Sequence, residues 1–167
     1  MEDLILRHIG QLATPTGRAA LHGGAMGEIR LIEDAAVVIR GGKIEAVGRD
    51  EDVMRGFGGT PAAELSAEGR CVVPGFIDPH THFLFAGARA QEYDDRLAGV
   101  PYLTLLARGG GIVSTMKDTR AADFDALYAC GRRTLLRMLR LGITTTEGKS
   151  GYGLDEETEC RLLQQHD

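Results

Sequence analysis

Two of the five histidines, His80 and His82, stand two positions apart directly after an apolar run at residues 71–77. On a strand, residues i and i+2 point to the same side, and parallel α/β barrels place catalytic groups at the C-terminal ends of their strands. Two neutral imidazoles on one side can bind a divalent metal such as zinc. Asp78 is in phase with them and could be a third polar group or a partner of a ligand. The alternative is a polar strand end packed under a loop.

The segment that follows the apolar run alternates between strand and helix patterns. The run itself predicts a strand buried on both faces. Further expected elements are helices at 91–97, after Pro101 until the glycines at 109–111, at 122–140 and at 156–165, and a strand at 143–147. Asp155 is expected to cap the last helix. Such alternation predicts a parallel sheet with right-handed crossovers.

The first 72 residues have the pattern of short strands and turns. Strands are expected at 4–6, 28–32 and 63–66, and as a hairpin of 35–40 with 43–47. Gly41 and Gly42 supply the positive φ that a two-residue hairpin turn needs. Asp50 is expected to cap a helical turn through Met54. This pattern favours a small β-sandwich or β-sheet module.

Composition excludes several classes of function. The chain has 167 residues and a net charge of −5, so we expect no affinity for nucleic acid or for an anionic membrane. Its first twenty residues contain no long apolar run, so neither a signal peptide nor a membrane span is expected. Cys71, Cys130 and Cys160 are far apart and odd in number, which favours reduced thiols in a cytoplasmic protein.

Several sequence blocks are similar to a known family. The segment at 73–82, VPGFIDPHTH, resembles the first barrel strand of the amidohydrolase superfamily. Four further blocks resemble the imidazolonepropionase family in their order and spacing: FAGAR at 85–89, RLAGVPY at 96–102, GGGIVST at 109–115 and KSGYGLD at 149–155. The resemblance extends over nearly the whole chain and is most specific from Val73 to Glu159.

The resemblance implies an α/β fold: the start of a metal-dependent-hydrolase (β/α)₈ TIM barrel at 73–167, preceded by a small β-sandwich module at 1–72. It implies that His80 and His82 bind one zinc or iron ion, and that Arg89, Tyr152 and Tyr102 contact the substrate. The implied reaction is hydrolysis of 4-imidazolone-5-propanoate to N-formimidoyl-L-glutamate, in histidine degradation. An arginine fork suits the propionate of this substrate, and the family suggests a homodimer.

The predicted barrel is incomplete in this chain. A TIM barrel needs roughly 250 residues, and the resemblance places the remaining metal ligands and the glutamate acid/base further on. We therefore predict no catalytic acid or base among these residues, and no activity of the chain alone. Lys149 is interpreted as structural or as a partner of a metal ligand.

Two other hypotheses remain open from the sequence. One is another amidohydrolase, such as a dihydroorotase or a nucleobase deaminase. The other is a non-catalytic fragment, in which Arg89 is an ordinary surface arginine and Tyr102 and Tyr152 are half-buried rings.

Overall fold

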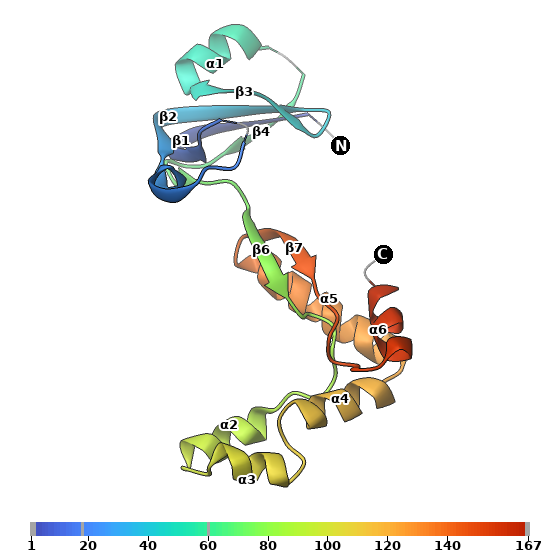
Figure 1. The fold of residues 1–167 in the computed structure, drawn as a ribbon. Coiled ribbons are helices and arrows are strands. Elements are labelled where there is room, and N and C mark those ends of the chain that lie inside the picture. Colours follow the sequence, from blue (N-terminus) through green and yellow to red (C-terminus); the bar gives the residue numbers. More distant parts are fainter. Residues whose placement is uncertain (1–2, 18, 60, 166–167) are drawn as a thin grey trace. The chain divides into compact units, whose positions relative to one another are not determined.

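The computed structural model describes residues 3–17, 19–59 and 61–165. Its contacts divide the chain into two compact units, Met1–Pro74 and Gly75–Asp167. All β-strands of the first unit belong to one mixed sheet, whereas the second unit combines two strands with five helices in its described part (Figure 1). Within the described residues, no helix has the length and apolar character needed to cross a membrane.

The first unit is built on a five-stranded sheet in the order β3-β2-β1-β4, with β5 also pairing with β1. Its strands are β1 (Leu4–Pro15), β2 (Ile29–Arg40), β3 (Lys43–Arg49), β4 (Ala63–Ser66) and β5 (Cys71–Val72), with a short 3₁₀ helix, η1, at Gly23–Gly27. The predicted hairpin is confirmed: β2 and β3 are antiparallel, and Gly41 and Gly42 in the turn have φ of 54° and 77°. The pairing of β1 with β2 extends far beyond the predicted segments 4–6 and 28–32.

Both faces of β2 are buried at residues 35–38, because alternate residues there enter two apolar clusters. Ala35 and Val37 pack with Ile9 on one face, whereas Ala36 and Val38 pack with Ile5 and Val53 on the other. Val53 comes from α1 (Asp50–Phe57), so this helix covers the second face. The second layer of the predicted β-sandwich stays a prediction, since the described residues of this unit form a single sheet.

Asp50 does not cap α1, and the prediction that it does is wrong. Arg49 is the N-cap, and no side chain caps the helix. The Asp50 carboxylate instead accepts hydrogen bonds from Arg7 Nε at 3.1 Å, Arg7 Nη2 at 2.7 Å and the backbone N–H of His8 at 3.3 Å. A register irregularity of β1 between Leu6 and Ile9 lies at these partners, which are more than forty residues away in sequence.

The second unit places β6 (Phe76–Thr81) beside β7 (Ile143–Gly148) in parallel, as the strand–helix alternation predicts. The helices are α2 (Ala90–Leu97), α3 (Tyr102–Ala107), α4 (Ile112–Ala121), α5 (Phe124–Arg140) and α6 (Glu156–Leu163). Asp155 caps α6, as predicted, by accepting a hydrogen bond from Thr158 N at 2.7 Å. The sequence pattern misses α4 because the residues that this helix buries, Thr115 and Thr119, are polar.

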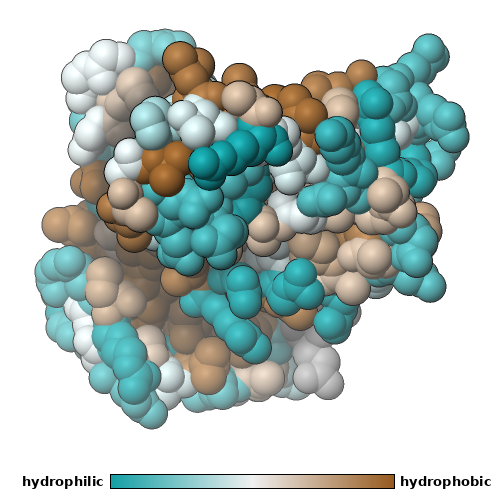
Figure 2. All heavy atoms as spheres, turned by 90° about the horizontal axis from the view of Figure 1, so that it is seen from below, coloured by the Kyte–Doolittle hydropathy of each residue, from teal (hydrophilic) through white to brown (hydrophobic). Residues whose placement is uncertain are grey.

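The apolar run at 71–77 is not one strand buried on both faces, so that prediction is wrong. It divides at Pro74 and Gly75, with β5 in the sheet of the first unit and β6 in that of the second. Proline lacks the N–H needed to continue a ladder. Phe76 and Ile77 are 56% and 69% exposed, because within the described residues β6 pairs only with β7. Figure 2 shows that other apolar side chains also lie on the surface of the molecule.

The second unit has its own apolar cluster beyond the strand. Phe83 and Leu84, which follow β6, pack with Leu127 of α5 and Leu162 of α6. Gly131 of α5 is also buried, and a Cβ there would lie 2.5 Å from Leu84 Cδ2. The segment that follows the histidines is therefore held against two helices.

Candidate metal and substrate site

The two histidines lie at the C-terminal end of β6, and their rings are neighbours. The ring centroids of His80 and His82 are 5.4 Å apart at an interplanar angle of 64°. Asp78 Oδ1 accepts a hydrogen bond from His80 N at 3.1 Å, so its carboxylate is engaged with the backbone. His82 Nδ1 is buried and has no hydrogen-bond partner. A buried nitrogen without a protein partner requires an explanation, and a bound metal ion is the one that the sequence predicts.

The ends of β6 and β7 are joined next to this pair. Lys149 N donates a hydrogen bond to Thr81 O at 2.8 Å. The Lys149 ammonium contacts the Glu147 carboxylate, and this hydrogen bond and charge, with a smaller effect of His80, lower the pKa of Glu147. The role of Lys149, structural or as a partner of a metal ligand, stays a prediction. Among the described residues, no group of three or more possible ligand side chains is assembled.

Tyr152 contacts the histidine pair from the loop that follows β7. Its ring centroid lies 5.1 Å from that of His82 and 5.2 Å from that of Phe85. The preceding Gly151 has a φ of 142°, and a Cβ on it would lie 2.9 Å from His82 Cε1. A side chain at position 151 would therefore collide with the imidazole. Two strand ends thus bring His80, His82 and Tyr152 together.

Arg89 and Tyr102 form a second group. Arg89 precedes α2, and its Nη1 lies 3.8 Å from Glu92 Oε2, a loose ion pair. A Cβ on Gly111 would lie 3.7 Å from Tyr102 Oη and 4.0 Å from Arg89 Nη1, so both polar groups approach this glycine. Glu92 Oε1 accepts a hydrogen bond from Gly111 N at 2.8 Å, which fixes the glycine run beside them.

Arg89 belongs to the second group and also borders the first. It lines one hollow with Phe85 and Tyr152 and another with Tyr102. Its side chain is 40% exposed, so the guanidinium has donors open to solvent. All five predicted site residues therefore lie in the second unit, at the end of β6, on the segments that follow β6 and β7, and at the start of α3.

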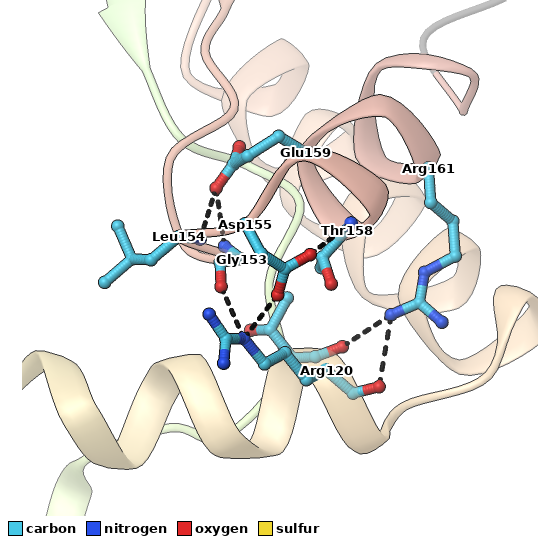
Figure 3. A network of polar contacts seen from close by, with 8 residues as sticks. Arg120, Gly153, Leu154, Asp155, Thr158, Glu159 and Arg161 are labelled. Atoms are coloured by element: carbon cyan, nitrogen blue, oxygen red, sulfur yellow. Dashed lines mark hydrogen bonds and ion pairs between the residues drawn. The ribbon is translucent and has the colours of Figure 1, made fainter.

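Sequence reasoning missed a polar network around Gly153, the residue that follows Tyr152 (Figure 3). Glu159 of α6 accepts hydrogen bonds from Gly153 N and Leu154 N, and Arg120 of α4 donates to Gly153 O. In the sequence these residues have the pattern of charged positions on the solvated faces of helices. Only the tertiary structure reveals that they reach the loop.

Comparison with solved structures identifies the class of fold. The chain is similar to guanine deaminase from E. coli, with a TM-score of 0.62 and 19% identity over 99% of this chain and 34% of that one. Guanine deaminase from Bradyrhizobium japonicum has a TM-score of 0.54 and 20% identity over 99% and 32%. At these identities the similarity concerns the fold alone, which is mixed α/β. No family model matches the chain.

The curated relatives of this chain carry the name of one enzyme. The chain is 45% identical over 160 residues to imidazolonepropionase from Parabacteroides distasonis, and 49% identical over 163 residues to that from Porphyromonas gingivalis. Each match covers 96% of this chain and 38% of the relative. The chain thus spans about two fifths of the length of these relatives. The resemblance to imidazolonepropionase that the sequence blocks predict is confirmed.

Proposed function

We propose that this chain acts within a metal-dependent hydrolase that opens the ring of 4-imidazolone-5-propanoate with water, giving N-formimidoyl-L-glutamate in histidine degradation. The observation that supports this most directly is the meeting of His80 and His82 with Tyr152, which comes from another sequence block of the same family resemblance. The 45–49% identity to imidazolonepropionases favours this substrate over those of other amidohydrolases.

His80 and His82 would hold one divalent metal, zinc or iron, through imidazole nitrogens. Such an ion would lower the pKa of a bound water and polarise the carbonyl oxygen of the ring amide. A catalytic zinc normally has three protein ligands, and the described part of the chain assembles no group of three. We therefore propose that the other ligands and the acid/base lie outside these residues, and that the chain alone is inactive.

Arg89, Tyr102 and Tyr152 would bind the substrate. A guanidinium presents a planar fork that matches a carboxylate, and Arg89 is held only loosely by Glu92. Arg89 can therefore turn to the propionate while Tyr152 stays against His82. The hydroxyl of Tyr102, which approaches the same glycine as Arg89, would add a further hydrogen bond.

The wider proposal follows from the same resemblance. The first unit would be part of a composite β-sandwich, and the second would supply the first strand–helix units of a TIM barrel, as the parallel pairing of β6 with β7 suggests. The complete protein would be a cytoplasmic homodimer that acts on a small molecule.

Metal content and turnover of the complete protein test the proposal. We expect His80→Ala and His82→Ala each to lose the bound metal, measured by elemental analysis. Activity should fall by more than the roughly 10–100-fold typical for loss of a group that only orients a ligand. His22→Ala is the matched control, because His22 is exposed in the first unit.

Two outcomes would contradict the proposal. Normal metal content in both variants would exclude the histidines as ligands. Turnover of guanine or dihydroorotate by the complete protein, without turnover of imidazolone propanoate, would favour another amidohydrolase.

A further inference from the structure

The loop between β7 and α6 has a backbone conformation that needs support. Leu154 has a φ of 56°, in the left-handed region that side chains rarely adopt. Its side chain is 51% exposed, so burial of this leucine contributes little to holding the conformation. The loop nevertheless carries Tyr152, whose ring lies against His82. Some other interaction must therefore stabilise the loop.

Glu159 supplies that interaction from the first turn of α6. Its Oε1 accepts a hydrogen bond from Gly153 N at 2.7 Å and another from Leu154 N at 2.8 Å (Figure 3). Burial acts to raise the pKa of Glu159, but hydrogen bonds from Leu154, Ser150, Gly153 and Gly151 outweigh it and lower the pKa overall. The carboxylate is therefore ionised at neutral pH, and hydrogen bonds to an ionised acceptor are the strong ones.

The other side of the loop is fixed by Arg120 of α4. Its Nε donates to Gly153 O at 2.6 Å and lies 2.7 Å from Asp155 Oδ2. Arg161 of α6 donates to Thr119 O at 3.1 Å, which joins α6 to the end of α4. Gly153 is thus bound through both its N–H and its carbonyl, directly after Tyr152.

We infer that Glu159 is a positioning residue: by holding the backbone at Gly153 and Leu154, it keeps the Tyr152 ring against His82. Tyr152 stands between Gly153, which Glu159 and Arg120 bind, and Gly151, which packs on the imidazole. A shift of this loop would therefore move the Tyr152 ring and at the same time uncover the His82 imidazole. The effect on substrate rests on the proposed function, whereas the effect on the loop does not.

Glu159→Gln in the complete protein tests the inference. The variant keeps the shape but loses the negative charge that receives two N–H groups. We expect amide hydrogen exchange at 150–154 to accelerate about tenfold and KM for imidazolone propanoate to rise about tenfold, with kcat within about threefold of the wild type. Glu159→Ala should show larger changes of the same kind. Glu157→Gln, at an exposed position of the same helix, is the matched control and should change neither quantity.

The outcomes separate this inference from the proposed function. Unchanged exchange at 150–154 in Glu159→Gln would overturn the role of Glu159 in the loop. Faster exchange with an unchanged KM would overturn its role in positioning Tyr152. If Glu159→Ala does not fold, Glu159→Gln decides alone. Absence of turnover by the wild-type protein would overturn the proposed function, while exchange in the substrate-free protein would still decide whether Glu159 holds the loop.

Discussion

The two units of the chain use their apolar residues differently. In the first unit, residues 35–38 of β2 are covered on both faces, by clusters around Ile9 and around Ile5. In the second, the two-stranded sheet leaves Phe76 and Ile77 more than half exposed, and the apolar cluster around Leu127 lies beyond the strand. A two-stranded sheet is marginal without further strands or a covering layer. The less covered unit is the one that carries every predicted site residue.

The two units also stabilise their backbone in different ways. In the first unit, neighbouring strands fix most of the backbone through ladder hydrogen bonds. In the second, the segment carrying Tyr152 is held by charged side chains of two helices, Glu159 and Arg120. Side chains of neighbouring helices therefore hold this segment in place of ladder hydrogen bonds.

The largest expected effect comes from Leu127, which is fully buried in the cluster of the second unit. Leu127→Ala should lower the free energy of unfolding by about 2–5 kcal/mol, because it removes buried methyl groups and leaves a cavity. Leu141→Ala is the control: Leu141 is 73% exposed, and a change within about 0.5 kcal/mol is expected. Urea denaturation of the complete protein measures both.

Hydrogen exchange would sharpen the comparison between the units. Leu127→Ala should reduce amide protection more strongly in Gly75–Asp167 than in Met1–Pro74. Equal loss of protection in both units would contradict the independent packing of their clusters.

A smaller, pH-dependent effect is expected from the ion pair of Arg7 and Asp50 in the first unit. Asp50→Asn should cost about 1–2 kcal/mol at neutral pH, because the side chains are only 24% and 17% exposed and form two hydrogen bonds. The hydrogen bond from Arg7 outweighs burial and lowers the pKa of Asp50 below its ordinary value of 3.8.

The sign of the pH dependence follows from that shift. A carboxyl whose pKa is lowered in the folded state contributes its full stability above its unfolded pKa and loses it as pH falls through the folded pKa. The difference between wild type and Asp50→Asn should therefore shrink below about pH 4. Glu51→Gln, at an exposed neighbouring position, is the control. A difference that grows on acidification would contradict the ion pair.

The smallest expected effect is at the start of α5 in the second unit. Asp123 Oδ1 accepts a hydrogen bond from Ala126 N at 2.8 Å and caps this helix. Asp123→Ala should lower the free energy of unfolding by about 1 kcal/mol, measured by thermal denaturation. Asp125→Ala removes a charge from the same first turn without removing the cap, and should cost about 0.3–0.5 kcal/mol. Equal losses would mean that charge, not the cap, stabilises the helix start.

Local signals predicted much of the fold. The Gly41-Gly42 turn and the Asp155 cap follow from rules that act over a few residues, and the parallel pairing of β6 with β7 follows from the alternation of strands with helices. The candidate site was predictable in part, because the spacing of His80 and His82 and the neighbouring family blocks identify residues that the structure then brings together.

The sequence by itself determined most of the strands and helices, though not α4 or the full length of β1 and β2, and which side chains could bind a metal, because these depend on residue type and spacing. Only the tertiary structure decided that Asp50 binds Arg7 instead of capping α1, that the run at 71–77 divides between two sheets, and that Glu159 reaches the loop of Tyr152. These outcomes depend on distant partners and on how many neighbours a strand has. The local sequence pattern contains information on neither the distant partners nor the number of neighbouring strands. Residues that resemble an ordinary cap, a buried strand and a solvated acid therefore take other roles.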